Sequence, residues 1–123
     1  MPPLSQTELL TLGLVTVGIL AILWKRFGKK SQSLSVAQLR ELKGKGALVL
    51  DVRSPAEFAS GHNKGSKNIP LDALPERLGE LKAGSVILAC CASGMRSGAA
   101  RRLLIKAGFT EVHNAGPWQT LKD

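Results

Sequence analysis

A cysteine, an arginine and a serine lie close together in one short stretch of the chain and could carry out nucleophilic chemistry. Cys91 is followed by Arg96 and then by Ser97. An apolar run from Val86 to Cys90 predicts a buried strand before this stretch, and the pattern of residues 97–107 predicts a helix after it. Helix N-termini and neighbouring arginines both lower the pKa of a thiol. The sequence therefore predicts a reactive thiolate at Cys91.

The residues around Cys91 resemble the active-site loop of the rhodanese sulfurtransferases, in which a cysteine precedes four residues, an arginine and a serine. The matching residues are Cys91, Ala92, Ser93, Gly94, Met95, Arg96 and Ser97. A second block resembles the family's other signature and comprises residues 51–58, Gly61-His62 and residues 65–70. Two motifs in the family's order are more specific than either motif alone. The resemblance covers about residues 34–121, and residues 114–116 are similar to the small phage-shock type of single-domain rhodanese.

This resemblance implies a sulfurtransferase that needs neither a metal nor an organic cofactor. The Cys91 thiolate would take the outer sulfur from thiosulfate or from a persulfide donor and become a persulfide. A thiol or cyanide would then accept that sulfur. Backbone N–H groups of residues 92–97 would hold the transferred sulfur, and Arg96 would orient the anionic donor. The expected substrate-binding residues are Ala92, Ser93, Gly94, Met95, Arg96, Ser97 and Arg53.

Cys90 offers a different assignment, because its spacing to Arg96 matches that of cysteine-based phosphatases. A loop counted from Cys90 is wide enough for phosphate, whereas the shorter loop from Cys91 suits a single sulfur atom. Phosphatase loops usually carry glycine three positions after the cysteine, and counted from Cys90 this position is Ser93. No acid placed to protonate a leaving group is identifiable. The sequence therefore favours sulfur transfer through Cys91, with a phosphatase using Cys90 as an alternative.

A second alternative is a non-catalytic, membrane-anchored docking module whose loop binds a protein or a small anion without turnover. Cys91 and Arg96 are both present in the loop. A docking module has no use for a reactive thiol, which is open to oxidation. We therefore rank this alternative below the enzyme.

Three further polar residues lie in or just after the second block. Asp51 and Arg53 stand at the end of a predicted strand, the edge of an open α/β sheet at which ligands bind. Arg53 is therefore a candidate to contact the substrate, whereas Asp51 is expected to anchor a neighbouring loop. His62 is expected at a hydrogen-bonded loop position, because sulfur transfer from a thiolate needs no general base.

Composition narrows the choice of partners and of environment. The chain carries a formal net charge of +8, but residues 25–30 supply four of its 17 basic side chains. No aromatic residues interleave the remaining basic ones, so a nucleic-acid partner is not expected, and the positive field better suits a small anion. The two cysteines are adjacent, which disfavours a disulfide and indicates a reducing compartment. Metal binding is not expected, because the two histidines are far apart and there is no Cys-x-x-Cys motif.

Alternating helical and strand patterns predict an α/β domain over residues 31–123, with a mostly parallel sheet and helices on both faces. Ser35 and Ser54 are candidate N-caps. Helices are expected over residues 36–43, 55–60 and 97–107, and a helix or helical turn over residues 71–81. Strands are expected over residues 47–52, 86–90 and 110–113. These elements are those that the rhodanese resemblance also implies.

Residues 1–30 are expected to form a membrane anchor. Residues 9–24 contain no charged side chain and are followed by the basic residues Lys25, Arg26, Lys29 and Lys30. This pattern predicts one transmembrane helix that contacts the membrane through residues 9–27, with Trp24 at the interface. The basic side faces the cytoplasm under the positive-inside rule, which predicts a single-pass inner-membrane protein with a cytoplasmic domain. A secretory signal peptide fits less well, because a positive n-region and a small-x-small cleavage site are both missing.

Overall fold

The structure is a computed structural model and describes residue 3, residues 5–27 and residues 33–123. The chain divides into two compact units, Met1–Gln32 and Ser33–Asp123. The first unit contains helix α1, which spans Gln6–Phe27. Side chains at positions 23–27 and all of residues 28–32 lie outside the described part of the chain, and so does the predicted role of the basic cluster at residues 25–30.

Helix α1 forms where the apolar run predicts a helix, but the structure does not support a membrane anchor. Ser5 caps the helix, because its hydroxyl accepts the Glu8 N–H while the Glu8 carboxylate accepts the Ser5 N–H. Among the described residues, no helix is both long and apolar enough to cross a bilayer. The predicted transmembrane helix therefore has no support in the described part of the chain.

The second unit is built on a four-stranded sheet in the order β2-β1-β3-β4, and each adjacent pair is parallel. Its strands are β1 (Leu48–Asp51), β2 (Lys67–Asn68), β3 (Val86–Cys91) and β4 (Glu111–Pro117). Because all strands run in one direction, their C-terminal ends share one edge. In the register of the sheet, Asp51 pairs with Cys90. The predicted α/β class with a parallel sheet is confirmed.

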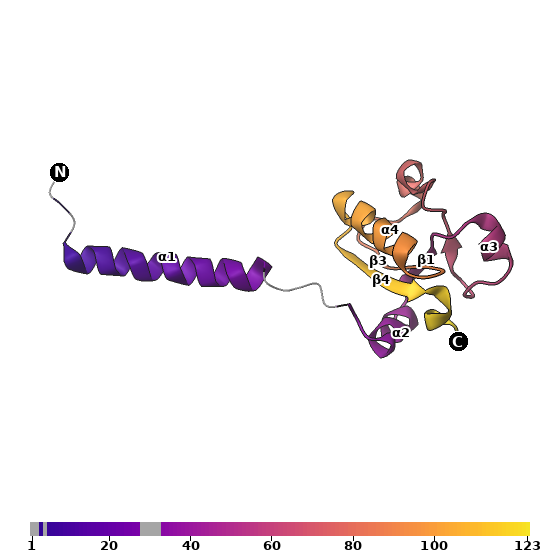
Figure 1. Ribbon diagram of the computed structural model, residues 1–123, viewed down its shortest axis with the longest axis horizontal. Coiled ribbons are helices and arrows are strands. Elements are labelled where there is room, and N and C mark those ends of the chain that lie inside the picture. The colour runs from indigo at the N-terminus through magenta and orange to yellow at the C-terminus, as the bar shows by residue number, and fades with distance from the viewer. Residues whose placement is uncertain (1–2, 4, 28–32) are drawn as a thin grey trace. The chain divides into compact units, whose positions relative to one another are not determined.

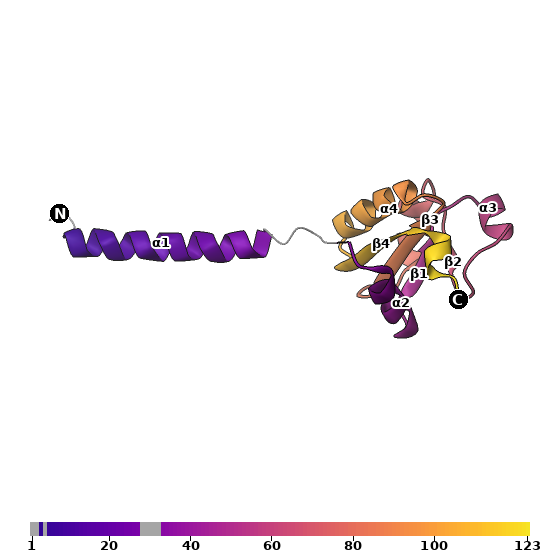
Figure 2. The same ribbon diagram turned by 60° about the horizontal axis from the view of Figure 1, so that its bottom comes forward.

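Helices α2 (Val36–Gly44) and α4 (Met95–Lys106) lie on opposite sides of the sheet, as Figures 1 and 2 show. Each covers its own apolar cluster. Leu104 of α4 packs in the cluster that contains Ile87 and Cys91, whereas Leu39 of α2 packs in the cluster that contains Cys90. Alternate residues of β3 therefore face different cores, as the period of a strand requires.

Helix α3 (Pro55–Ala59) begins at the predicted N-cap, since the Ser54 hydroxyl accepts the Glu57 N–H and the Glu57 carboxylate accepts the Ser54 N–H. Of the helix or helical turn predicted over residues 71–81, the structure forms only turns. The structure has two short 3₁₀ turns there, η1 (Leu74–Glu76) and η2 (Leu78–Glu80). Pro75 falls inside the predicted stripe, where it removes a backbone donor and clashes with the preceding turn.

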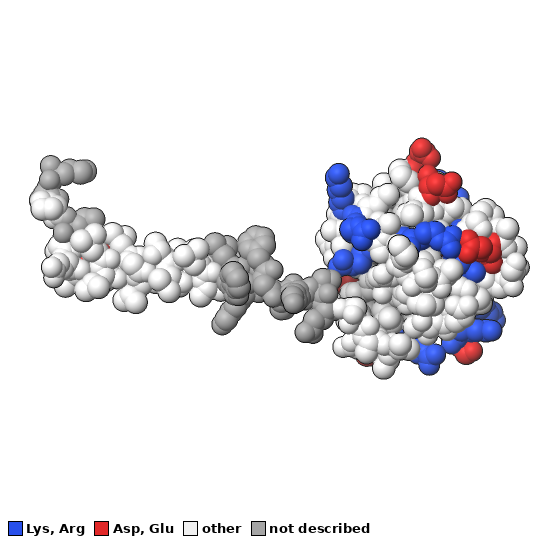
Figure 3. Space-filling model, viewed as in Figure 1, with Lys and Arg blue, Asp and Glu red and all other residues white. Residues whose placement is uncertain are grey.

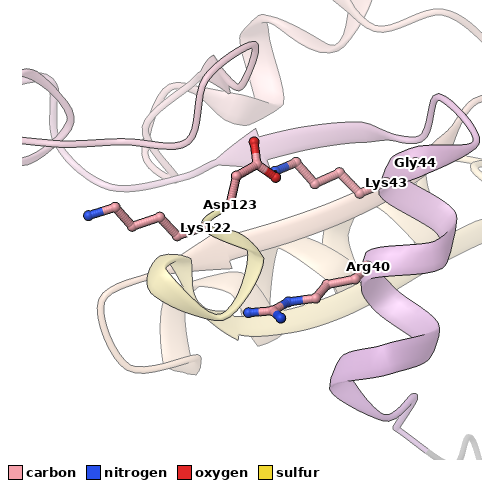
Figure 4. A pocket seen from close by; sticks show the side chains of 5 residues that line it. All are labelled: Arg40, Lys43, Gly44, Lys122 and Asp123. Carbon is pink, nitrogen blue, oxygen red and sulfur yellow. The ribbon is translucent and has the colours of Figure 1, made fainter.

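The chain ends in a further 3₁₀ turn, η3 (Trp118–Leu121), which α2 holds in place. Arg40 Nε donates to the Thr120 carbonyl, and Lys43 Nζ donates to the Leu121 carbonyl at 2.7 Å. Figure 4 shows Lys43 also reaching the Asp123 carboxylate, 3.0 Å away. These contacts use side chains that line a surface cavity of about 470 Å³. They keep η3, and with it Trp118, against the rest of the domain.

Candidate active site

The loop between β3 and α4 wraps around the sulfur of Cys91. Gly94 N–H donates to Cys91 Sγ at 2.9 Å, and the Ser97 hydroxyl lies 3.3 Å from the same sulfur. Cys91 and Ser97 are both fully buried. The loop residues Ala92, Ser93 and Met95 are exposed, with Met95 at 82%. The turn therefore places hydrogen-bond donors on the buried sulfur and an apolar side chain at the surface.

Gly94 makes this turn possible because its φ of +99° lies in the left-handed region. A Cβ atom at Gly94 would also come within 3.3 Å of Gly116 Cα. The close approach follows from a register shift in the sheet between Ala89 and Cys90, which brings Gly116 opposite Cys90. Helix α4 then begins at Met95, two residues before the predicted start.

Asn114 of β4 fixes the loop through three hydrogen bonds. Its Oδ1 accepts from the Ser97 hydroxyl at 2.7 Å and from the Gly116 N–H at 2.9 Å, while its Nδ2 donates to the Gly94 carbonyl at 3.0 Å. The Ser97 hydroxyl is thus held between the amide of Asn114 and the sulfur of Cys91. Asn114 is absent from the predicted site residues, although the Asn-Ala-Gly motif that contains it was a visible signal.

The surroundings of the two cysteines give their thiols opposite pKa shifts. Burial raises the pKa of Cys91, but hydrogen bonds from the Ser97 hydroxyl and from the N–H groups of Ser97, Gly94 and Ser93 outweigh it. The net pKa of Cys91 therefore lies below that of an ordinary thiol. For Cys90, burial and then the charge of Asp51 raise the pKa to about 12. Cys91 is the more acidic thiol, and the geometry gives no support to the Cys90 phosphatase alternative.

Arg96 projects from the first turn of α4 and is already paired. Its Nη1 and Nη2 donate to the two carboxylate oxygens of Glu57 at 2.7 and 2.9 Å. Hydrogen bonding from Arg96, and then from the Ser54 N–H, lowers the pKa of Glu57 to about 2, so this carboxylate is ionised at neutral pH. The N-cap pattern could have identified Glu57 as a helix cap. It carried no information on a partner 39 positions away.

Arg53 lies at the same edge of the sheet but is only 4% exposed. Its guanidinium binds both carboxylate oxygens of the fully buried Asp51 and donates to the carbonyls of Glu57 and Gly61. The ring of Trp118 lies 4.7 Å from the Arg53 guanidinium carbon. These contacts fix the chain on either side of α3. The Arg53 N–H groups that make these bonds are thus occupied by acceptors of the protein itself.

His62 occupies a hydrogen-bonded position just beyond α3. Its Nδ1 lies 2.7 Å from the Phe58 carbonyl, and its ring stacks on the Phe58 ring at 3.7 Å. In the described part of the chain, no group of three or more His, Cys, Asp or Glu side chains could hold a metal ion. The polar groups gathered at the loop are the sulfur of Cys91, its hydrogen-bond donors and the Arg96–Glu57 pair.

Comparison with known proteins identifies the family of the domain that contains this loop. The rhodanese-like domain family matches residues 35–115. The chain belongs to the rhodanese-like family. Thiosulfate sulfurtransferase PspE of Escherichia coli is 35% identical to the chain over 69 residues, which cover 54% of this chain and 66% of PspE. Human single-domain sulfurtransferase TSTD1 superposes with a TM-score of 0.66 and 28% identity, over 73% of this chain and 94% of TSTD1.

A further relative is YqhL of Bacillus subtilis, which is 41% identical over 68 residues. The match covers 55% of this chain and 54% of YqhL, so the chain spans about half the length of that relative. Relatives of the rhodanese-like domain carry the name thiosulfate sulfurtransferase, which places the chain in a sulfurtransferase family.

We predict that the Ser97 hydroxyl contributes measurably to the acidity of Cys91. In a Cys90→Ser background, thiolate ultraviolet absorbance should titrate at a lower pH than that of an ordinary cysteine, whose pKa is about 8.5. The Ser97 hydroxyl can turn its one proton from Asn114 Oδ1 to the Cys91 thiolate, so Ser97→Ala should move this midpoint upward. The Cys91→Ser variant keeps only Cys90, which should titrate near pH 12. A midpoint that Ser97→Ala leaves in place would contradict this assignment.

We also predict that Arg53 is important for stability. Arg53→Met leaves the buried Asp51 carboxylate without its partner and should lower the free energy of unfolding by about 3–5 kcal/mol. Urea denaturation of the full chain measures this change. The matched control is Arg77→Met, which breaks the exposed pair with Glu80 and should cost about 0–1 kcal/mol. Equal losses of unfolding free energy in the two variants would contradict this prediction.

Proposed function

We propose that the protein is a sulfurtransferase in which Cys91 carries the transferred sulfur as a persulfide. In the first half-reaction the Cys91 thiolate attacks the outer sulfur of thiosulfate or of a persulfide donor. A bond forms between Cys91 Sγ and that sulfur while the donor's S–S bond breaks. The electron pair of the broken bond leaves with sulfite, or with the thiolate of a persulfide donor. Cys91 now holds a terminal sulfur that is itself anionic.

In the second half-reaction an acceptor removes the terminal sulfur. Cyanide attacks it to give thiocyanate, or a thiolate attacks it to give a new persulfide, and Cys91 leaves as a thiolate ready for the next cycle. The two half-reactions share one covalent intermediate, which predicts ping-pong kinetics. The reacting groups are those of donor, acceptor and Cys91, so the cycle routes no step through a metal or an organic cofactor.

The observation that carries this proposal is the set of donors directed at Cys91 Sγ. N–H groups of the loop stabilise negative charge on the sulfur, in agreement with the lowered pKa of Cys91. The same N–H groups are suited to hold an anionic sulfur one bond further out. Membership of a family whose relatives are named thiosulfate sulfurtransferases supports the same chemistry.

We also propose that the domain works in a reducing compartment. Cys90 and Cys91 are both free thiols, and the proposed cycle begins and ends with a free thiolate at Cys91. Oxidation of that thiol would stop turnover. A predominantly reduced Cys91 in protein alkylated at the moment of cell lysis would agree with this placement, and a predominantly oxidised one would contradict it.

We predict that thiosulfate loads one sulfur atom onto the full chain. Intact-protein mass spectrometry should show a mass gain of one sulfur for the wild type and for Cys90→Ser, and none for Cys91→Ser. Addition of cyanide should remove the extra mass and release thiocyanate. The Cys90→Ser variant is the matched control, because it alters the neighbouring residue of the same strand. Loading that persists without Cys91 but is lost without Cys90 would overturn the assignment.

The alternative function is a non-catalytic docking module. Such a protein would take up no sulfur from thiosulfate or from an organic persulfide, although its Cys91 thiol titrates as predicted above. Loading without release to cyanide or to any thiol would likewise contradict turnover.

A further inference from the structure

The charge at the mouth of the loop differs from what the net charge of the chain suggests. Arg96 and Glu57 have side chains 38% and 37% exposed, and the carboxylate uses both oxygens on the guanidinium. An arriving anion therefore meets an ion pair in place of a free cation. It must either displace Glu57 from Arg96 or approach a site of low net charge.

A cavity of about 490 Å³ is lined in part by Arg96 and places an apolar surface beside the Arg96–Glu57 pair. Its apolar lining residues are Val52, Pro55, Pro70, Leu71 and Ala73. Among the described residues, the cavity lining also includes Asp72, a second carboxylate. Arg96, Glu57 and Asp72 together bear one positive and two negative charges. This local charge disfavours a small dianion, whereas the apolar wall favours a donor with a hydrocarbon group.

Building on the sulfurtransferase function proposed above, we propose that Glu57 is a specificity-determining residue that directs the site toward monoanionic organic sulfur donors. By holding Arg96 in a bidentate pair beside an acidic and apolar cavity, Glu57 weakens the binding of the thiosulfate dianion. The favoured donor class carries one negative charge on its outer sulfur and an apolar group that fits against Pro55, Pro70 and Leu71. Organic thiosulfonates and organic persulfides share this chemistry.

The sulfur-transfer step balances for this donor class. With an organic thiosulfonate, the Cys91 thiolate attacks the outer sulfur, and a bond forms between Cys91 Sγ and that sulfur. The bond between the two donor sulfurs breaks, and its electron pair leaves with the organic sulfinate. Two negative charges are present before and after the step. No proton, oxidant or reductant is needed.

Three donors separate the effect of charge from that of the apolar wall. Thiosulfate is a dianion, methanethiosulfonate is a small monoanion, and benzenethiosulfonate is a monoanion with an aromatic group. With cyanide as acceptor, thiocyanate formation by the wild-type full chain should give the highest kcat/KM for benzenethiosulfonate and the lowest for thiosulfate. A wild type that prefers thiosulfate to benzenethiosulfonate would overturn the proposal.

Glu57→Gln tests the residue itself. Glutamine still accepts the Ser54 N–H, so the cap of α3 is retained. The positive charge of Arg96 is then no longer neutralised by a carboxylate. Because electrostatic energy scales with the charge of the donor, kcat/KM should rise by about fourfold for thiosulfate and about twofold for methanethiosulfonate. The gain should appear in KM, with kcat little changed. Loosening of the loop would shift both donors equally and leave their ratio unchanged, which would overturn the proposal.

Glu80→Gln is the matched control. Glu80 is also paired with an arginine, is 40% exposed and has a pKa held at about 2 by Arg77 and Lys67. Unlike Arg96, neither of these two partners lines the cavity. Its variant should leave the donor ratio unchanged, and a change equal to that of Glu57→Gln would overturn the local explanation.

Asp72→Asn provides a second variant, independent of any effect of Glu57→Gln on folding. It should shift the donor ratio in the same direction, because it also removes a negative charge from the mouth. No shift in this variant would contradict the charge argument.

Failure of this inference can be told apart from failure of the proposed function. If none of the three donors places sulfur on Cys91, the sulfurtransferase function itself is wrong. If all three load Cys91 but their ratio is the same in the wild type, Glu57→Gln and Asp72→Asn, only the role of Glu57 is wrong.

Discussion

The hydrogen bonds that the β3–α4 loop donates to Cys91 Sγ are the constraint on which the site depends. They require the chain to reverse within three residues, which the left-handed Gly94 allows. They also require the loop to stay in place, and Asn114 ensures this by binding Ser97, Gly94 and Gly116 from the neighbouring strand. A parallel sheet is what brings these segments together, because the C-terminal ends of β3 and β4 share one edge.

The pleat of β3 separates the roles of two adjacent cysteines. Cys91 faces the core under α4 and meets the donors of the loop, whereas Cys90 faces the core under α2 and lies near the charge of Asp51. Two identical side chains, one residue apart, therefore have pKa values shifted in opposite directions. The Arg53–Asp51 pair also stabilises this edge of the sheet, because Arg53 connects strand β1 to the segment around α3.

Sequence reasoning identified the features that depend on local pattern. The cysteine loop, the parallel α/β fold and the caps at Ser35 and Ser54 follow from short motifs and hydrophobic period, and the structure has them. For residues 71–81 the pattern left a helix or a helical turn open, and Pro75 in the leucine stripe explains why only turns form. The membrane span was inferred from a run of sixteen uncharged residues, and the structure does not support it. The Arg96–Glu57 pair was missed because only the folded chain joins positions so far apart.

The most direct test of the central claim is a crystal structure of the protein after incubation with an excess of sulfur donor. We expect electron density for one additional sulfur on Cys91 Sγ, within hydrogen-bonding distance of N–H groups from residues 92–97, and no change at Cys90. Additional sulfur on Cys90, or a bare Cys91 in protein whose mass shows sulfur uptake, would contradict the claim that this loop generates and shelters the reactive sulfur.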